Sequence, residues 1–360
     1  PTFAALVWTN TGIDIRPVDT AVRGLRQGVV TGDRWDATNI GIGSVAFGSN
    51  NLAGGYFSAT LSGAQNWIDT NAPFSVIAGG VSNAIVGSVF GAHFIGGGRS
   101  NIISSLSSNN VIAGGYGNFT DASSRGASIG GGYSNRVQQI FGTVAGGSGN
   151  FAGGSHGAIG GGQGNIAGST SAADFDTIGG GQLNLIQGGD YGTIGGGETN
   201  QVLNNAQHGV ISGGRGNDMN SADSSMGGGA LNTIGINSPA ATIHGGYSNN
   251  IVNPSALAVV VGNFGTNSVP KSVLISPAGT HGPNRMQVAA PGTTNIGPFS
   301  VKTGAPNNYA GVGGTLTNAT TQSGSAGTGA TNLQTFMVLG HTLTNVGDRL
   351  VIRAAGKFSP

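Results

Sequence analysis

A short repeat that ends in asparagine runs through the middle of the chain. Its pattern is an apolar residue, a usually small residue, two glycines, two variable residues and asparagine, and residues 77–83, 95–101 and 129–135 are clear copies. From Asn83 to Asn249, eleven copies of the asparagine cover 166 residues in ten steps, so the mean period is 16.6 residues. A fixed short period is the sequence signature of a solenoid, in which each repeat packs against its neighbours.

Three positions of this repeat hold a fixed type of residue. Six residues before each asparagine stands Ile, Val or Met, and three residues before it stands glycine in all eleven copies. A second apolar residue usually follows two residues after the asparagine. The apolar, glycine and asparagine positions of five representative copies are Ile77, Gly80 and Asn83; Ile95, Gly98 and Asn101; Ile129, Gly132 and Asn135; Ile159, Gly162 and Asn165; and Ile194, Gly197 and Asn200.

These positions predict that each repeat forms one coil with two short strands. A helix would need a 3.6-residue apolar stripe, and each glycine inside it would cost about 1 kcal/mol. Stacked coils instead place the Ile column in a continuous core that no single repeat could bury. We expect the glycine to serve a positive φ or a close backbone approach. We expect the asparagine in a turn, where it tolerates the left-handed conformation and forms a ladder with the asparagine of the next coil.

Composition agrees with stacked strands and excludes other classes of protein. The chain has 71 glycines in 360 residues, but they do not recur at every third position, which excludes collagen. The net charge is +1 and the basic residues are scattered, so we expect no nucleic-acid partner. No stretch approaches the ~20 apolar residues that span a bilayer, so we expect no membrane insertion. The absence of cysteine excludes a disulfide framework and a zinc–thiolate site.

The fold class that we predict is all-β: a short-coil parallel β-solenoid, a β-roll of about 14 coils of 15–19 residues, with a small C-terminal β segment. Residues 1–40 hold much of the charge and are expected to form an N-terminal connector or cap. Residues 41–265 form the solenoid, residues 266–330 a transition and Gly/Ser/Thr linker, and residues 331–360 the start of a β-sandwich-like tip module. A thin core with a flat glycine face predicts self-association through that face, most simply as a homotrimer.

Chemically active groups are few. Glu198 is the only glutamate, and glycoside hydrolysis would need two carboxylates roughly 5–9 Å apart. Asp174 with Asp176, or Glu198 with Asp190, could meet, although we favour loop capping for them. The six histidines occupy unrelated positions of the repeat, and the Gly-Gly-x-Gly-x-Asp pattern at 213–218 occurs once. We therefore predict no catalytic residue, no metal site and no cofactor, and no enzyme activity.

Three tyrosines are candidate ligand contacts. Tyr116, Tyr133 and Tyr247 each stand two residues before a repeat asparagine, at a position expected on a turn or on the outer surface. Exposed tyrosines on a fibre could stack against sugars, which makes them candidate glycan contacts. Isolated exposed aromatic residues are also common, and that ordinary explanation stays open.

The repeat resembles a known family. Residues 44–51, with the sequence Ser-Val-Ala-Phe-Gly-Ser-Asn-Asn, are the copy most similar to the head domains of trimeric autotransporter adhesins, the YadA-like left-handed parallel β-roll. The resemblance covers about residues 41–265 and implies a tight trimer of rolls. In this chain the period is longer, and runs of three glycines are more frequent.

The end of the chain resembles a second family. Residues 331–358 are similar to the opening of a jelly-roll module found at the tips of phage tail fibres. Leu350, Ile352 and Ala354 alternate with the residues between them, as a half-buried strand would. This resemblance implies a repetitive shaft followed by a tip that contacts a receptor.

Together these features predict a non-enzymatic structural fibre, a phage tail fibre or virion fibre that presents a receptor-binding surface. The expected location is the virion surface, the extracellular space or the cell surface, and the expected partners are further copies of the chain and a host-surface glycan or protein. One alternative is a bacterial surface adhesin or extracellular filament subunit. A second is a tailspike that depolymerises polysaccharide.

Overall fold

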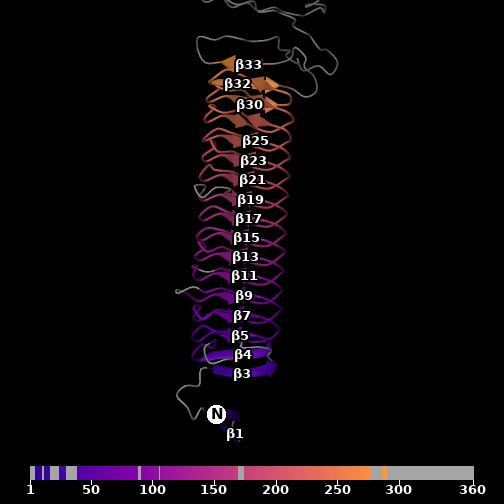
Figure 1. Ribbon diagram of the computed structural model, residues 1–360. Helices are drawn as coiled ribbons and strands as arrows, with labels where there is room; N and C mark the ends of the chain where they lie inside the picture. The colour runs from indigo at the N-terminus through magenta and orange to yellow at the C-terminus, as the bar shows by residue number, and fades with distance from the viewer. Residues whose placement is uncertain are drawn as a thin grey trace, which may run out of the picture.

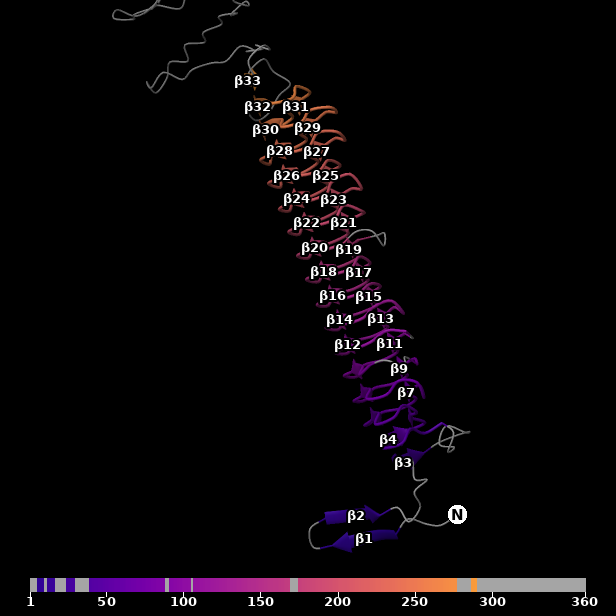
Figure 2. The same cartoon turned by 90° about the vertical axis from the view of Figure 1, so that its left-hand side faces the viewer.

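The described part of the chain is a straight stack of coils. The computed structural model describes residues 5–9, 12–16, 24–29, 39–87, 91–104, 106–168, 174–276 and 286–289. These residues form strands and turns without a helix, and the coils follow one another along a single axis (Figures 1 and 2). The prediction of an all-β parallel solenoid is therefore confirmed.

Two long sheets run the length of the stack. In sheet 1 the strands pair in single file and all pairs are parallel, except that β32 and β33 at the end are antiparallel. The strands of sheet 1 are β3 (Gly24–Val29), β4 (Ser44–Ser49), β6 (Ala59–Thr60), β8 (Val76–Ile77), β10 (Phe94–Ile95), β12 (Val111–Ile112), β14 (Ser128–Ile129), β16 (Thr143–Val144), β18 (Ala158–Ile159), β20 (Thr177–Ile178), β22 (Thr193–Ile194), β24 (Val210–Ile211), β26 (Ser225–Met226), β28 (Thr242–Ile243), β30 (Val259–Gly262), β32 (Ser272–Ser276) and β33 (Met286–Ala289).

Sheet 2 has 14 parallel strands, which thirteen turns of the solenoid connect. Each strand of sheet 2 follows a strand of sheet 1 in the same coil. The strands of sheet 2 are β5 (Leu52–Ala53), β7 (Trp67–Ile68), β9 (Ala84–Ile85), β11 (Ile102–Ile103), β13 (Phe119–Thr120), β15 (Arg136–Val137), β17 (Phe151–Ala152), β19 (Ile166–Ala167), β21 (Leu185–Ile186), β23 (Gln201–Val202), β25 (Asp218–Met219), β27 (Thr233–Ile234), β29 (Asn250–Ile251) and β31 (Thr266–Asn267).

A third ladder lies between the two sheets. It consists of twelve isolated parallel bridges, which link one residue of each coil from Ser49 to Tyr247. We call the residues of this ladder the bridge column. Each of them stands two residues before the repeat asparagine of its coil, so this part of the repeat is also held in register.

The ends of the stack differ from the predicted boundaries. β3 pairs in parallel with β4, and β30 pairs in parallel with β32, so the stack extends beyond residues 41–265 in both directions. An antiparallel hairpin of β1 (Ala5–Thr9) and β2 (Gly12–Arg16) precedes it. Of the predicted transition and linker at 266–330, residues 266–276 and 286–289 are described and pair with the stack. The rest of that range and the predicted tip module at 331–360 lie outside the described residues.

The core is built from the two apolar positions of the repeat. Within each two-residue strand except β5, where both residues are buried, one side chain points inward and is buried, whereas its neighbour points outward. Ile77, Ile95 and Ile129 of sheet 1 are completely buried, as are Ile85 and Ile103 of sheet 2. Because a single coil supplies only about two such side chains, each worth ~1.5–3 kcal/mol when buried, the core exists only once the coils have stacked.

A second internal column consists of the repeat asparagines. Thirteen of them, from Asn51 to Asn249, are buried. The Asn135 side chain is typical: its Nδ2 donates to the carbonyl oxygens of Gly131 at 2.8 Å and Gly147 at 2.9 Å. Its Oδ1 accepts the backbone N–H of Asn150 at 3.0 Å. Each asparagine thus bonds its own coil and the next coil, which satisfies backbone groups that would otherwise be buried without partners.

The turn itself is made by a different residue from the one expected. None of the thirteen asparagines of the column has a positive φ; the residue before each of them does, as Ser82, Ser134 and Gly149 show. The expectation that the asparagine occupies the left-handed position is therefore wrong. The physical reason is that the left-handed turn aims the asparagine side chain inward, where the ladder needs its amide.

The invariant glycine of the repeat provides both a positive φ and a close backbone approach, the two roles expected from the sequence. Gly147 has a φ of +89°, and a Cβ on it would lie 2.1 Å from the carbonyl oxygen of Gly162 in the next coil. Both the positive φ and the close backbone approach therefore exclude a side chain. The glycine before it is different, because a Cβ on Gly146 would have nothing within 4 Å.

This difference predicts opposite outcomes for two adjacent substitutions. We expect Gly147→Ala to prevent normal stacking of its coil, because the new methyl group would overlap backbone of the next coil. Gly146→Ala meets no such overlap within its own chain, so we expect it to lower the thermal unfolding midpoint much less than Gly147→Ala does. Circular dichroism melts of both variants would check this, and equal losses would contradict the glycine assignment.

A second prediction concerns the asparagine column. Asn232→Ala would leave the backbone N–H of Asn249 and two glycine carbonyl bonds without the amide. The Gly246 carbonyl still accepts the Ala230 N–H, so two buried groups, the Asn249 N–H and the Gly228 carbonyl, are left unpaired. At about 1–3 kcal/mol for each, we expect a loss of roughly 3 kcal/mol. The control is Asn250→Ala, because Asn250 is exposed on β29. Denaturant midpoints would measure both, and a small loss for Asn232→Ala would contradict the ladder's role.

Candidate functional site

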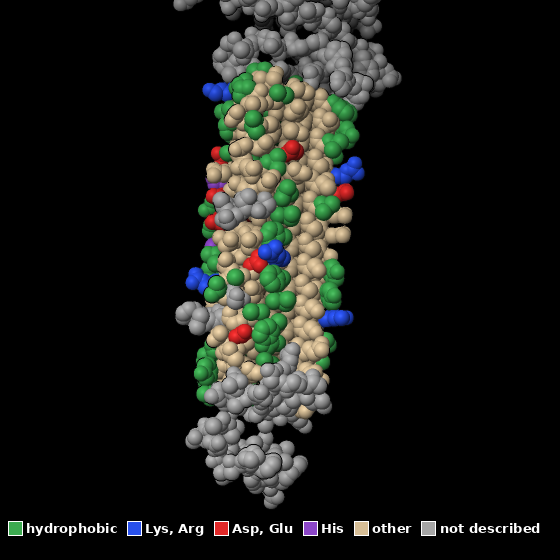
Figure 3. Space-filling view, in the orientation of Figure 1, with side chains coloured by type: hydrophobic (Ala, Val, Ile, Leu, Met, Phe, Trp, Pro, Cys, Tyr) green, Lys and Arg blue, Asp and Glu red, His purple; other side chains and the backbone are tan. Residues whose placement is uncertain are grey.

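The outer surface carries side chains in straight lines. Because successive coils are in register, residues at the same position of the repeat lie one above another along the rod. Figure 3 shows hydrophobic side chains following such a line up the middle of the face in view, over the strands of sheet 2. The outward residues of sheet 2 that form this line are Trp67, Ala84, Ile102, Phe119, Arg136, Phe151, Ile166 and Leu185.

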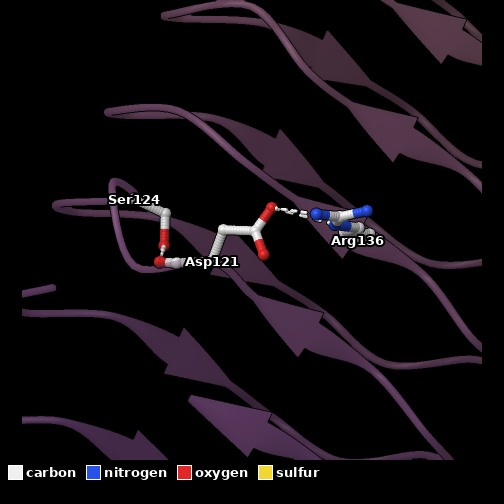
Figure 4. A network of polar contacts seen from close by, with 3 residues as sticks. All are labelled: Asp121, Ser124 and Arg136. Carbon is white, nitrogen blue, oxygen red and sulfur yellow. Dashed lines mark hydrogen bonds and ion pairs between the residues drawn. The ribbon is translucent and has the colours of Figure 1, made fainter. Parts of the chain in front are cut away.

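One charged group interrupts this apolar line. Arg136 lies between Phe119 and Phe151, with its guanidinium 5.7 Å and 5.3 Å from their ring centroids. Its Nε donates to Oδ2 of Asp121 at 2.9 Å, and the Ser124 hydroxyl donates to the Asp121 carbonyl oxygen (Figure 4). The arginine is thus neutralised and stacked, and its arrangement is that of a structural contact on the sheet.

The three candidate tyrosines all belong to the bridge column. Tyr116, Tyr133 and Tyr247 are 43%, 55% and 46% exposed, in agreement with the outer position expected for them. Tyr116 and Tyr133 are in adjacent coils, and their rings stack with centroids 5.3 Å apart and planes within 4°. The guanidinium of Arg99 lies 5.8 Å from the centroid of the Tyr116 ring. The structure therefore brings two of the three tyrosines together.

Tyr247 lies apart from that pair. Seven bridges of the column separate it from Tyr133. Its ring meets Phe264 edge to face, with centroids 5.3 Å apart. Tyr247 therefore does not share a surface with Tyr116 and Tyr133, and its predicted glycan contact stays a prediction.

Polar side chains continue the bridge column beyond the tyrosine pair. The residues that follow Tyr133 are Ser148, Gln163, Gln182, Glu198 and Arg215. All but Ser148 are exposed. Within the described part of the chain, the side chains of Gln163, Gln182 and Glu198 make no hydrogen bond or ion pair, so their polar heads face solvent.

A second aromatic column was missed in the sequence. Phe141, His156, Phe175, Tyr191 and His208 stack in five successive coils, with centroid separations of 5.2, 4.4, 5.0 and 5.3 Å. We call these five residues the turn column. Each stands three residues before the buried apolar residue of its coil, and that spacing was the signal that could have revealed it.

The rings of the turn column cover one another. Each of the five residues has a φ between 54° and 62°, so each occupies a left-handed turn. The guanidinium of Arg125 lies 5.8 Å from the Phe141 ring centroid at one end. At the other end, Nδ1 of His208 is 2.9 Å from Oδ1 of Asp223. Because neighbouring rings occupy the ring faces, this column stabilises the stack and offers solvent mainly ring edges.

Three of the four candidate carboxylates link neighbouring coils. Oδ1 of Asp174 accepts the Ser155 N–H at 3.1 Å, and Oδ1 of Asp190 accepts the Asp174 N–H at 3.1 Å. Oδ1 of Asp176 accepts the Gly192 N–H at 2.9 Å. These contacts match the loop-capping role that we favoured. Asp190 precedes β22 and Glu198 follows it in the bridge column, so the two belong to different columns.

Two buried titratable groups have shifted pKa values. Burial raises the pKa of Asp176 to about 7; the Gly192 N–H opposes this rise, and the charges of Asp190 and Asp174 add to it. Burial lowers the pKa of His93 to about 4, which a backbone hydrogen bond at Ser107 partly offsets. Both groups lie inside the stack at the position before a strand of sheet 1, so their neutral forms are the ones that fit the core.

The described residues contain no group of three His, Asp or Glu side chains that could hold a metal ion. Asp218, the acidic residue of the calcium-like pattern, lies in β25 between Gln201 and Thr233, and burial raises its pKa. None of the described residues forms a helix of the length and hydrophobicity that a bilayer span needs.

Comparison with known proteins does not add a relative. No family model matches the chain, and a search of curated proteins found no match either.

Asp176 generates a testable pH dependence. Its folded pKa of about 7 lies above its ordinary value of 3.8, so the carboxyl costs no stability below pH ~4. As the pH rises from about 4 to 7 the unfolded chain releases a proton that the folded chain retains, and stability is lost. We expect Asp176→Asn to raise the melting temperature at pH 8 and to change it little at pH 4.

The same melts need a control for charge. Asp69→Asn removes one charge at a carboxylate that caps its own turn, through the Asn71 N–H. It should not remove the loss of stability between pH 4 and 8. A wild-type profile that is flat over this range would contradict the assignment to Asp176.

Proposed function

We propose that this chain is a non-enzymatic structural fibre protein, of the phage tail-fibre or virion-fibre kind, that presents a receptor-binding surface. The observation that carries the proposal is the rod itself: a stack of coils in register, with exposed side chains repeated in straight columns. A solenoid of this kind is compatible with a fibre, an adhesin or a tailspike-like protein. Among them we favour the fibre because three of the four candidate carboxylates, Asp174, Asp176 and Asp190, are engaged in links between coils.

A trimer is part of the proposal. Gly146 supports it, because no atom of the described residues lies within 4 Å of a Cβ placed there. Gly114 supports it too, since a Cβ on it would meet no atom closer than 3.9 Å. Glycine at these two surface positions is explained if the flat face lies directly against another copy, where a side chain would hold the two surfaces apart. A closed threefold arrangement would cover this face on every copy.

Two alternative functions, an adhesin or filament subunit and a tailspike depolymerase, each predict a different experimental result. An adhesin or filament subunit would use the same rod, and the resemblance to YadA-like heads supports the adhesin. A tailspike depolymerase would need a working carboxylate pair, and Asp174 with Asp176 is the pair to test. Release of reducing ends from capsular polysaccharide by the purified protein would support the depolymerase over the fibre.

The assembly can be measured directly. We expect light scattering of the native protein to give a mass near three times 35.3 kDa that does not change on dilution. Gly146→Arg should reduce this mass to that of one chain and leave the β circular dichroism spectrum intact. Ser123→Arg, on an exposed turn, is the matched control and should remain trimeric.

The contrary outcomes are distinct. A wild-type monomer would argue against the trimer and favour the depolymerase. Open-ended polymers would favour a filament subunit. A trimer that survives Gly146→Arg would exclude the glycine face as its interface.

A further inference from the structure

Within the described part of the chain, only one face of the Tyr133 ring is stacked against another ring. Tyr116 stacks on that face with parallel rings. On the open side the next residue of the bridge column is Ser148, whose small side chain cannot cover a tyrosine ring. Within the described part of the chain, no second ring and no guanidinium lies against this open face. Tyr133 is 55% exposed, the most exposed of the three candidate tyrosines.

We propose that the bridge column from Tyr116 to Glu198 binds a linear, neutral, β-1,4-linked glycan, with one pyranose ring seated on the open face of Tyr133. The sugars that follow lie along the rod and are hydrogen-bonded by Gln163, Gln182 and Glu198. The inference rests on the proposed function, because it names the class of receptor that the fibre surface recognises.

The chemistry of the column fits this ligand. The flat side of a pyranose presents C–H groups, which pack on the electron-rich face of an aromatic ring. Amide and carboxylate heads are the side-chain groups that donate to and accept from sugar hydroxyls. Those of Gln163, Gln182 and Glu198 are exposed in successive coils, at the ~4.8 Å spacing of paired strands. That spacing is close to the length of one pyranose in an extended β-1,4 chain, so consecutive sugars can meet consecutive coils.

The charge of the column favours a glycan over a nucleic acid. Single-stranded nucleic acids also stack on aromatic side chains, but their binding surfaces follow the phosphates with basic residues. Between Tyr133 and Arg215 the column carries one carboxylate, Glu198, and no basic residue. The Glu198 carboxylate would repel a phosphodiester chain along this path, whereas it would not repel a neutral sugar chain.

Two other exposed tyrosines, Tyr191 and Tyr247, lack this arrangement. The Tyr191 ring lies between those of Phe175 and His208. Tyr247 meets Phe264 edge to face, and the residue on the other side in its column is Ala230, so no run of polar heads follows it in the column. Tyr133 thus differs from these residues in having an open face at the start of a polar run.

The test is binding of the full chain to two immobilised probes, cellohexaose and chitohexaose. We expect the wild-type protein to bind at least one of them. Tyr133→Ala should weaken that binding about tenfold, the loss expected for one stacked ring. Gln182→Ala should weaken it by a smaller factor. Tyr191→Ala is the matched control, since it also removes a stacked, exposed tyrosine, and should bind as the wild type does.

Absence of wild-type binding to both probes would overturn the inference, and so would an equal loss for Tyr191→Ala and Tyr133→Ala. Circular dichroism melts establish that each variant keeps its stacked coils, and Tyr133→Phe, which keeps the ring, should restore binding if Tyr133→Ala does not fold. Adsorption of the fibre to bacterial cells distinguishes failure of this inference from failure of the proposed function. If the wild type adsorbs and Tyr133→Ala adsorbs equally, this inference fails and the proposed function stands; if the wild type adsorbs to no cells, the proposed function fails.

Discussion

The buried asparagine column holds the coils in register, and the other columns depend on it. Each asparagine donates its amide protons to carbonyl oxygens of its own and the next coil, and its Oδ1 accepts a backbone N–H of the next coil. These bonds fix both the height and the rotation of one coil relative to the next. The cost of burying a polar side chain is offset only when every partner is present, so a coil that slips loses several bonds together. Register is therefore strongly specified along the whole rod.

Because the register is fixed, residues at one position of the repeat form a straight column on the surface. Rings at one position stack into the turn column, and small or polar residues at another leave a ring face open, as Ser148 does beside Tyr133. The same kind of residue can therefore have two different roles. Tyr191 is covered on both sides and stabilises turns, whereas Tyr133 keeps a face toward solvent. Neighbours in adjacent coils, about one period away in sequence, decide between the two.

Much of the fold followed from the repeat because each repeat position has one physical environment. The Ile position had to be buried, and a glycine without exception had to lack room for a Cβ, as Gly147 shows. The position of the left-handed turn was mistaken by one residue, since asparagine is favoured both in turns and in ladders and the pattern does not separate the two. The turn column was missed because its residues are of three types, Phe, His and Tyr, and the variable loops stand just before them.

The sequence by itself determined a parallel solenoid with an isoleucine core, an asparagine ladder and glycines at every coil. It could do so because these are properties of one repeat and its copy, and the period places each residue against its equivalent. Only the tertiary structure decided which aromatic faces are covered, that Asp174, Asp176 and Asp190 link adjacent coils, and that Gly146 is free of the constraint on Gly147. Those properties depend on the φ angles and on distances of a few ångströms between coils, which residue types alone do not fix.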